Sequence, residues 1–177
     1  RTMLTELAVP GRTYLATPPA FRQHVPDAMR YWWRGENRRK AWAPHMSNAR
    51  GLIDAGIDDL TSRRTVVVLG SGPLFDIPLE SLARNFARVV LVDRVHPASI
   101  RPRVARYRNI EITHRDLAAT AGDEPLAFLD AIGDLDWVIS ANLLGALAAA
   151  AADGEARRAV DGHLDQIGRA SCRERVY

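Results

Sequence analysis

A run of β-branched and leucine residues, Thr65-Val66-Val67-Val68-Leu69, constrains the fold of this chain more than any other feature. The run shows no alternation of polar and apolar side chains, so a strand made from it must be buried on both faces. A parallel sheet covered by helices on both sides provides that burial. Gly70-Ser71-Gly72-Pro73 follows directly and predicts a tight turn after the strand.

Strand and helix patterns alternate after this turn. Further strands are predicted at 88–93, 110–113 and 137–140. Helical segments are predicted between them at 79–86, 100–107 and 126–132, and again at 143–164 with an interruption at Asp153-Gly154. Asp76 and Pro78 are expected to open the first of these helices. The alternation predicts an α/β fold with a Rossmann-like, doubly wound and mainly parallel sheet, here incomplete.

The first 62 residues predict a small helical subdomain in front of the sheet. Proline and glycine pairs indicate an irregular lead-in over residues 1–23. A helix is predicted from Pro26 to Lys40, and Pro44 is expected to break it or to start another. Ser47 is a candidate cap for the helix that follows.

The sheet-containing domain is expected to span residues 63–166, because the residues after it have a different character. Residues 167–177 resemble the in-frame translation of a sequencing adapter, so we interpret them as an artefactual tail and the chain as truncated at its C-terminus. The tail carries three arginines, one glutamate and Cys172, the sole cysteine. Without it the formal net charge is +1 rather than +3, and no cysteine remains for a disulfide or a metal site.

Targeting and membrane signals are missing from the pattern. No segment resembles a signal peptide. The longest apolar run, Leu143 to Ala152, is shorter than the roughly 20 residues that a bilayer-spanning helix needs. The chain is therefore expected to be soluble and cytoplasmic, with no membrane partner, and its oligomeric state is left open.

Residues suited to a ligand follow each predicted strand. In doubly wound sheets, ligands bind beside the carboxyl ends of the strands, where the strand order reverses. Gly70 and Gly72 allow the backbone to approach a ligand closely. Asp93 offers two acceptors to the hydroxyls of a ribose, whereas Asp116 could accept from an exocyclic amine. Both acids could instead cap the helices that follow them.

These segments resemble the motifs of class I S-adenosylmethionine-dependent methyltransferases. Val67 to Pro73 is similar to the glycine-rich first motif, and Leu91-Val92-Asp93 to the second strand with its ribose-binding acid. Ile110 to Leu117 and Leu135 to Asn142 are similar to the third and fourth motifs. The resemblance implies that S-adenosyl-L-methionine is bound by residues at the four strand ends, namely Gly70, Ser71, Gly72, Pro73, Asp93, Arg94, Asp116, Leu117, Ala141 and Asn142.

The family pattern is not complete in this chain. Val68 stands where the family usually has an acidic residue, and Leu74 stands in place of its third glycine. The resemblance implies methyl transfer to an acceptor that we expect to be a small molecule, with no metal and no identified catalytic residue. Among the aromatic and histidine residues of the N-terminal helices, Tyr31, Trp32, Trp33 and His45 could lie over the open edge of the sheet, although packing of a helical cap would also explain them.

Three alternatives remain open. An NAD(P)-dependent oxidoreductase also uses Gly70, Gly72 and an acid such as Asp93, but it has no use for Asp116. A non-catalytic nucleotide-binding or scaffold domain would explain the two departures from the family pattern. A nucleic-acid acceptor could meet the basic cluster between Arg30 and Lys40, but a solvated helix face explains this cluster as well, and the near-neutral charge disfavours nucleic acid.

Overall fold

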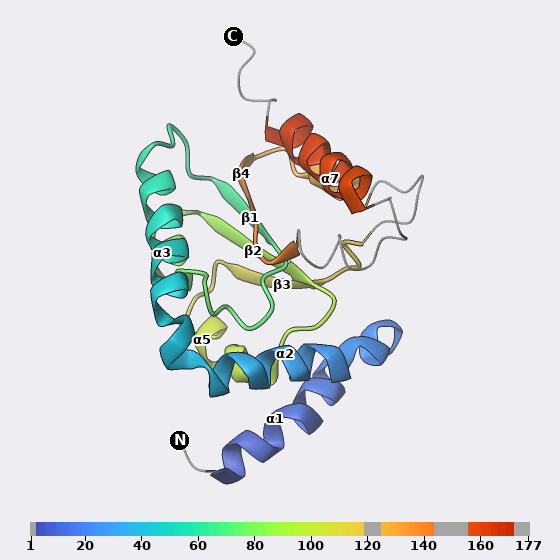
Figure 1. Cartoon of the computed structure of the whole chain (residues 1–177). Helices are drawn as coiled ribbons and strands as arrows, with labels where there is room; N and C mark the ends of the chain where they lie inside the picture. The colour runs from blue at the N-terminus through green and yellow to red at the C-terminus, as the bar shows by residue number, and fades with distance from the viewer. Residues whose placement is uncertain (1–2, 119–124, 144–155, 172–177) are drawn as a thin grey trace.

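The structure, a computed structural model, describes residues 3–118, 125–143 and 156–171 (Figure 1). Its strands are β1 (Thr65–Leu69), β2 (Arg88–Asp93), β3 (Ile110–His114) and β4 (Leu135–Ser140). All neighbouring strands pair in parallel, in the order β3-β2-β1-β4. The protein is therefore an α/β protein with the predicted Rossmann-like parallel sheet, of which the described residues form four strands.

The helices lie before, between and after these strands. The α-helices are α1 (Met3–Ala16), α2 (Val25–Asn37), α3 (Arg39–Asp58), α4 (Leu79–Asn85), α5 (Arg101–Val104) and α7 (Ala156–Ser171). Short 3-10 helices are η1 (Pro19–His24), η2 (Ala98–Ile100) and η3 (Ala127–Ala131). Figure 1 shows α3 and α7 on opposite sides of the sheet and α2 across one of its edges.

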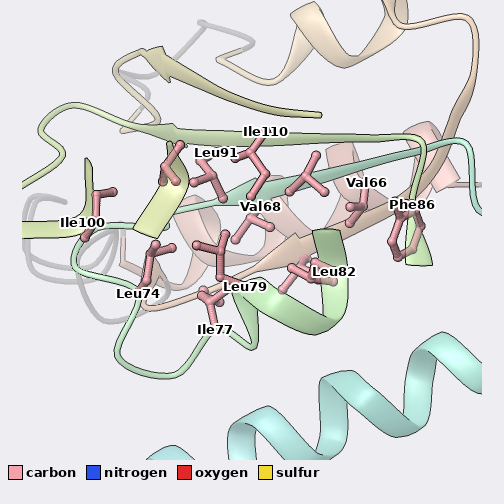
Figure 2. Close-up of a cluster of buried hydrophobic side chains, with 14 of the residues drawn as sticks. Val66, Val68, Leu74, Ile77, Leu79, Leu82, Phe86, Leu91, Ile100 and Ile110 are labelled. Atoms are coloured by element: carbon pink, nitrogen blue, oxygen red, sulfur yellow. The ribbon is translucent and has the colours of Figure 1, made fainter. Parts of the chain in front are cut away.

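Strand β1 is buried on both faces, as its composition predicts. Val66 and Val68 face a cluster of apolar side chains that includes Ile57 of α3 and Leu82 of α4 (Figure 2). The alternate side chains of β1 face a second cluster, which Leu129 of η3 joins. Side chains of successive strand residues point to opposite faces, so helices on both sides are required to bury this strand completely.

The N-terminal lead-in is helical, so the prediction of an irregular segment over residues 1–23 is wrong. Helix α1 contains Pro10, which removes one backbone hydrogen bond from the helix. Tertiary contacts outweigh this loss. Thr13 is fully buried, donates its hydroxyl to the Val9 carbonyl and accepts a hydrogen bond from the Ala98 amide at 2.9 Å.

Pro44 neither ends nor starts a helix, contrary to the prediction. Helix α3 is continuous from Arg39 to Asp58 with Pro44 inside it, and Ser47 lies within the helix and not at a cap. Met46 and Ile57 are both buried and lie about three turns apart on one face of α3. Burial of this face stabilises α3 enough to offset the cost of a proline inside the helix.

The segments between the strands differ in detail from the prediction. Asp76 does not cap α4, because the N-cap residue is Pro78 and no side chain caps the helix. The segments predicted near 100–107 and 126–132 form only the short α5, with η2 before it, and η3. Of the helix predicted over 143–164, residues 144–155 lie outside the described residues, and α7 continues to Ser171.

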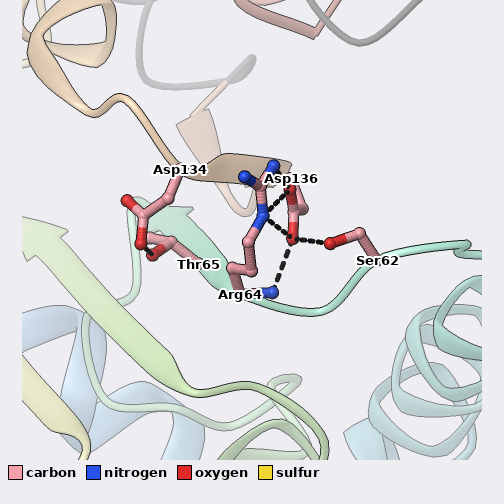
Figure 3. Close-up of polar contacts among 5 residues, drawn as sticks. All are labelled: Ser62, Arg64, Thr65, Asp134 and Asp136. Atoms are coloured by element: carbon pink, nitrogen blue, oxygen red, sulfur yellow. Dashed lines mark hydrogen bonds and ion pairs between the residues drawn. The ribbon is translucent and has the colours of Figure 1, made fainter.

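A polar network joins β1 and β4 at the amino edge of the sheet (Figure 3). The Asp136 carboxylate is fully buried and accepts hydrogen bonds from the Ser62 hydroxyl at 2.8 Å and from the backbone and guanidinium of Arg64. Beside it, Thr65 donates its hydroxyl to Asp134 at 3.0 Å. The network satisfies a buried charge at the edge of the sheet opposite the carboxyl ends of the strands.

No helix among the described residues is long and apolar enough to cross a membrane.

The network around Asp136 yields a stability prediction. We expect Asp136→Ala to lower the free energy of unfolding by about 2 kcal/mol, because the partly buried Ser62 hydroxyl and the backbone and side chain of Arg64 lose the buried carboxylate that accepts their hydrogen bonds. The matched control is Glu111→Ala, which breaks a bidentate but half-exposed ion pair with Arg88 and should cost less than about 1 kcal/mol. Urea unfolding followed by circular dichroism measures both, and equal losses would contradict the prediction.

Candidate functional site at the carboxyl edge of the sheet

A cavity of about 340 Å³ lies at the carboxyl ends of the strands. The strand order reverses between β1 and β4, because β2 and β3 lie on one side of β1 and β4 on the other. Chains leaving β1 and β4 therefore diverge and leave a crevice, which is where doubly wound sheets bind ligands. The cavity volume lies at the small end of the range of about 300–1,000 Å³ that small-molecule sites occupy.

Gly70 allows the chain to turn at the end of β1. Its φ angle is +71°, in the left-handed region that favours glycine. A Cβ atom at this position would lie 2.1 Å from the carbonyl oxygen of Ala141, which the Ala141 amide holds in place by donating to the Leu69 carbonyl at 2.8 Å. Ala141 is therefore packed beneath the turn and does not line the cavity.

The Asp93 carboxylate at the end of β2 faces the same cavity. Its Oδ2 accepts the Gly72 amide at 2.9 Å, and its Oδ1 accepts the Arg94 amide at 2.7 Å. Burial raises the pKa of Asp93, and backbone N–H groups and the charge of Arg94 oppose that rise. A carboxylate has about four acceptor sites, and the amides of Gly72, Arg94 and Val95 occupy three of them, so one remains for a ligand hydroxyl.

Ser71 is turned away from the cavity and into the protein. Its hydroxyl lies 3.0 Å from Nε2 of the fully buried His96, whose ring contacts His114 edge-on at 5.0 Å between centroids. His114 Nδ1 donates to the Arg94 carbonyl at 3.0 Å, since a carbonyl only accepts. This network holds the Gly70–Gly72 turn from behind. Sequence reasoning did not find His96, which no local motif marks.

Asp116 lies at the rim and does not line the cavity. Its carboxylate accepts Arg94 Nε at 2.8 Å and the Ala118 amide at 2.9 Å. Asp116 thereby orients Arg94, which does line the cavity. Leu117 and Ala118 form an apolar wall of the cavity next to Asp116. Arg115, the neighbour of Asp116, also lines the cavity and stacks over the Phe128 ring at 4.4 Å.

Asn142 connects the turns that follow β1 and β4. Its φ angle is +57°, which asparagine tolerates better than most residues. Its side-chain amide donates to Asp76 at 2.8 Å. Asn142 and Pro73 both line the cavity, so this hydrogen bond fixes one corner of it.

Helix α2 and the residue before it supply the wall opposite the strand ends, through His24, Asp27, Ala28 and Tyr31. Burial, and then the charges of Asp76 and Asp93, raise the pKa of Tyr31, so its phenol stays protonated near neutral pH and can donate a hydrogen bond. Of the other residues predicted for this edge, Trp32 and Trp33 pack against Val95. His45 is exposed and does not line the cavity.

The cavity thus brings together seven of the ten predicted cofactor residues, namely Gly70, Gly72, Pro73, Asp93, Arg94, Leu117 and Asn142. Ser71, Asp116 and Ala141 lie behind or beside it. Arg115 and Ala118 also line the cavity and were not predicted. Their position at the end of β3, next to Asp116 and Leu117, is a sequence signal by which they could have been found. Asp27 and Ala28, distant in sequence and on an ordinary amphipathic helix, gave none.

Comparison with protein-family models, with curated proteins and with solved structures finds no match to this chain.

His96 yields a prediction of pH-dependent stability. Burial, with His114 and Arg101 nearby, lowers the pKa of His96 from 6.5 to about 3. The unfolded chain therefore binds more protons than the folded protein between these values, so His96 reduces stability as the pH falls below about 6.5. Between pH 7.5 and pH 5, the free energy of unfolding of His96→Gln should fall by about 2 kcal/mol less than that of the unaltered protein.

Urea unfolding at the two pH values measures this difference. The exposed His45→Gln is the control and should behave like the unaltered protein. Contributions from His163, whose pKa burial also lowers, are common to all three proteins and cancel. Identical pH dependence in all three would show that His96 does not carry the effect.

Proposed function

We propose that this chain binds the adenosyl group of S-adenosyl-L-methionine in the carboxyl-edge cavity and is a methyltransferase acting on a small-molecule acceptor. The observation that carries the proposal is the partly buried Asp93 carboxylate, which accepts the Gly72 amide at 2.9 Å beside the turn that follows β1. An acid at the end of the second strand next to a glycine turn suits the paired hydroxyls of a ribose.

The residues of the cavity fit an adenosyl group. Asp93 keeps an acceptor position for a ribose hydroxyl, and Leu117 and Ala118 provide an apolar surface for a base. Gly70 and Gly72, both with positive φ angles, leave the turn without side chains that would exclude a ligand. Arg94, which Asp116 positions through an ion pair, also lines the cavity.

When bound, S-adenosyl-L-methionine supplies a methyl group on a sulfonium, a leaving group that is already activated. The chain then has to bind, orient and exclude water, which are the main contributions of protein to such a displacement. Tyr31 and Asn142 face the cavity from α2 and from the end of β4. Tyr31 can donate its hydroxyl proton to an acceptor molecule in a hydrogen bond, and its raised pKa makes it unsuited to act as a base at neutral pH.

Charge pairing on the N-terminal helices supports a small-molecule acceptor over a nucleic acid. Arg30 is paired with Asp27, and Arg39 is held by both carboxylate oxygens of Glu36 at 2.7 and 2.8 Å. These pairs reduce the net charge of the basic cluster between Arg30 and Lys40, the part of the chain that could contact a phosphate backbone.

A nicotinamide-dependent oxidoreductase is the second candidate. It is favoured by the position of Asp116 at the rim, because the residue that distinguishes the two functions does not line the cavity. Asp93 and the glycine turn suit the adenosine ribose of either cofactor. Binding measurements with both cofactors therefore decide between them.

We predict that S-adenosylhomocysteine binds with a submillimolar dissociation constant and that Asp93→Ala weakens this binding by at least about tenfold. The reason is the loss of a charge-assisted hydrogen bond to the ribose, which is worth roughly 1.5–3 kcal/mol. Isothermal titration calorimetry on the purified chain measures both constants. Asp54→Ala, an exposed aspartate on α3 outside the cavity, is the control and should leave binding unchanged.

NADH is titrated under the same conditions. Binding of NADH without binding of S-adenosylhomocysteine would overturn the methyltransferase proposal in favour of the oxidoreductase. Binding of neither would leave a domain that does not use this cavity for an adenosyl group. A thermal melt of Asp93→Ala shows whether the variant is folded, so that lost binding is not mistaken for lost structure.

A further inference from the structure

A second cavity of about 440 Å³ lies on the other side of the loop that follows the glycine turn. It is bounded by α2 and α3, by residues 73–78, and by parts of α4, η2 and α5. Pro73 is the one residue that lines both cavities among those described. The proposed adenosyl site makes no use of this second cavity.

The floor of the second cavity is apolar and belongs to the buried core. Leu74, Ile77 and Ile100 line it and are at most 2% exposed. Figure 2 shows Leu74 and Ile100 at the end of the core cluster opposite Phe86. Trp32 and Met46, also buried, complete the lining from α2 and α3. The surface that a ligand can reach comes mainly from the exposed Ala43 and the partly buried Pro73 and Phe75, which also line the cavity and suit the hydrocarbon part of a ligand.

The wall formed by Phe75 is held from two sides. A Cβ atom at Gly35 would lie 2.0 Å from the Phe75 ring, so this ring can pack against α2 only because residue 35 is glycine. Arg50 of α3 donates to the Phe75 carbonyl. The loop is thus fixed against both helices, and the cavity beside it has defined walls.

The rim of the cavity carries three arginines against two glutamates, Arg39, Arg50 and Arg103 with Glu36 and Glu80. Arg39 pairs with Glu36, and Arg103 pairs with Glu80 at 3.2 Å. Arg50 is hydrogen bonded to a neutral carbonyl, so the rim has one surplus positive charge.

Glu80 marks where an anion is stabilised on this rim. Partial burial raises its pKa, but its backbone hydrogen bond and the charges of Arg103 and Arg50 outweigh this effect, and the pKa is lowered. Both guanidinium groups therefore act on one carboxylate. The Arg103–Glu80 pair is partly exposed, and partly exposed ion pairs are weak, so a ligand carboxylate can compete with Glu80 for the arginines.

We propose that the second cavity binds a small organic anion with an aromatic or aliphatic body. Its carboxylate lies at Arg50 and Arg103, and its body lies on the apolar floor beside Phe75 and Trp32. Arginine favours carboxylates because its planar fork makes two parallel hydrogen bonds with them. This binding does not depend on the proposed adenosyl site.

Three probes with the same body and different charge test the proposal, namely phenylbutyrate, phenylbutanol and phenylbutylamine. Titration calorimetry on the full chain at pH 7.5 should show binding of phenylbutyrate, with phenylbutanol weaker by at least about tenfold and phenylbutylamine undetected. Equal affinity for the acid and the alcohol would overturn the assignment of an anion site. No binding of phenylbutyrate would overturn the site itself.

Variants of the rim should change phenylbutyrate affinity in opposite directions. Arg50→Gln should weaken it by about tenfold, because a guanidinium contact is lost. Glu80→Gln should strengthen it by about two- to fivefold, because a competing carboxylate is removed. Damage to the fold would not produce tighter binding, so Glu80→Gln distinguishes a site from a structural effect.

Arg84→Gln, an exposed arginine of α4 that does not line the cavity, is the matched control and should leave the affinity unchanged. Weaker or unchanged binding in Glu80→Gln would overturn the role of the rim, as would an equal loss in Arg50→Gln and Arg84→Gln.

Discussion

The close packing of Gly70 on the carbonyl of Ala141 is the constraint on which the carboxyl edge of the sheet depends. Strands β1 and β4 are adjacent and parallel, so their carboxyl ends lie side by side. The segment that follows β1 has room to turn there only because residue 70 has no side chain. The turn brings the Gly72 amide to the Asp93 carboxylate at the end of β2. A Cβ atom at residue 70 would therefore disturb three strand ends and not one.

Strands β1 and β2 could be predicted from the sequence to the residue because their burial is nearly complete. An apolar run without alternation has few alternatives to a two-sided strand, and the bounds of β1 and β2 match the prediction. Parallel pairing then places every strand end at one edge. The positions of Gly70, Asp93 and Asn142 around one cavity follow from that rule and need no knowledge of side-chain contacts.

The residues that the sequence misplaced are those whose position depends on contacts between distant segments. Pro10 and Pro44 are local signals against a helix, yet the burial of Thr13 and Ile57 against later parts of the chain keeps both helices intact. Asp116 reached the strand end as predicted, but its carboxylate turns to Arg94, the residue after Asp93. Pairing between side chains from separate strands has no signature in a local pattern.

Helix α2 lines both cavities, so the N-terminal helices form part of the carboxyl edge of the sheet. Tyr31 lines the first cavity and Trp32 lines the second, because consecutive residues of a helix point about 100° apart. The Tyr31 ring also contacts Phe75, the wall of the second cavity, with 6.3 Å between ring centroids. The cavities therefore share one helix and one loop. A substitution in α2 aimed at either cavity also alters a wall of the other.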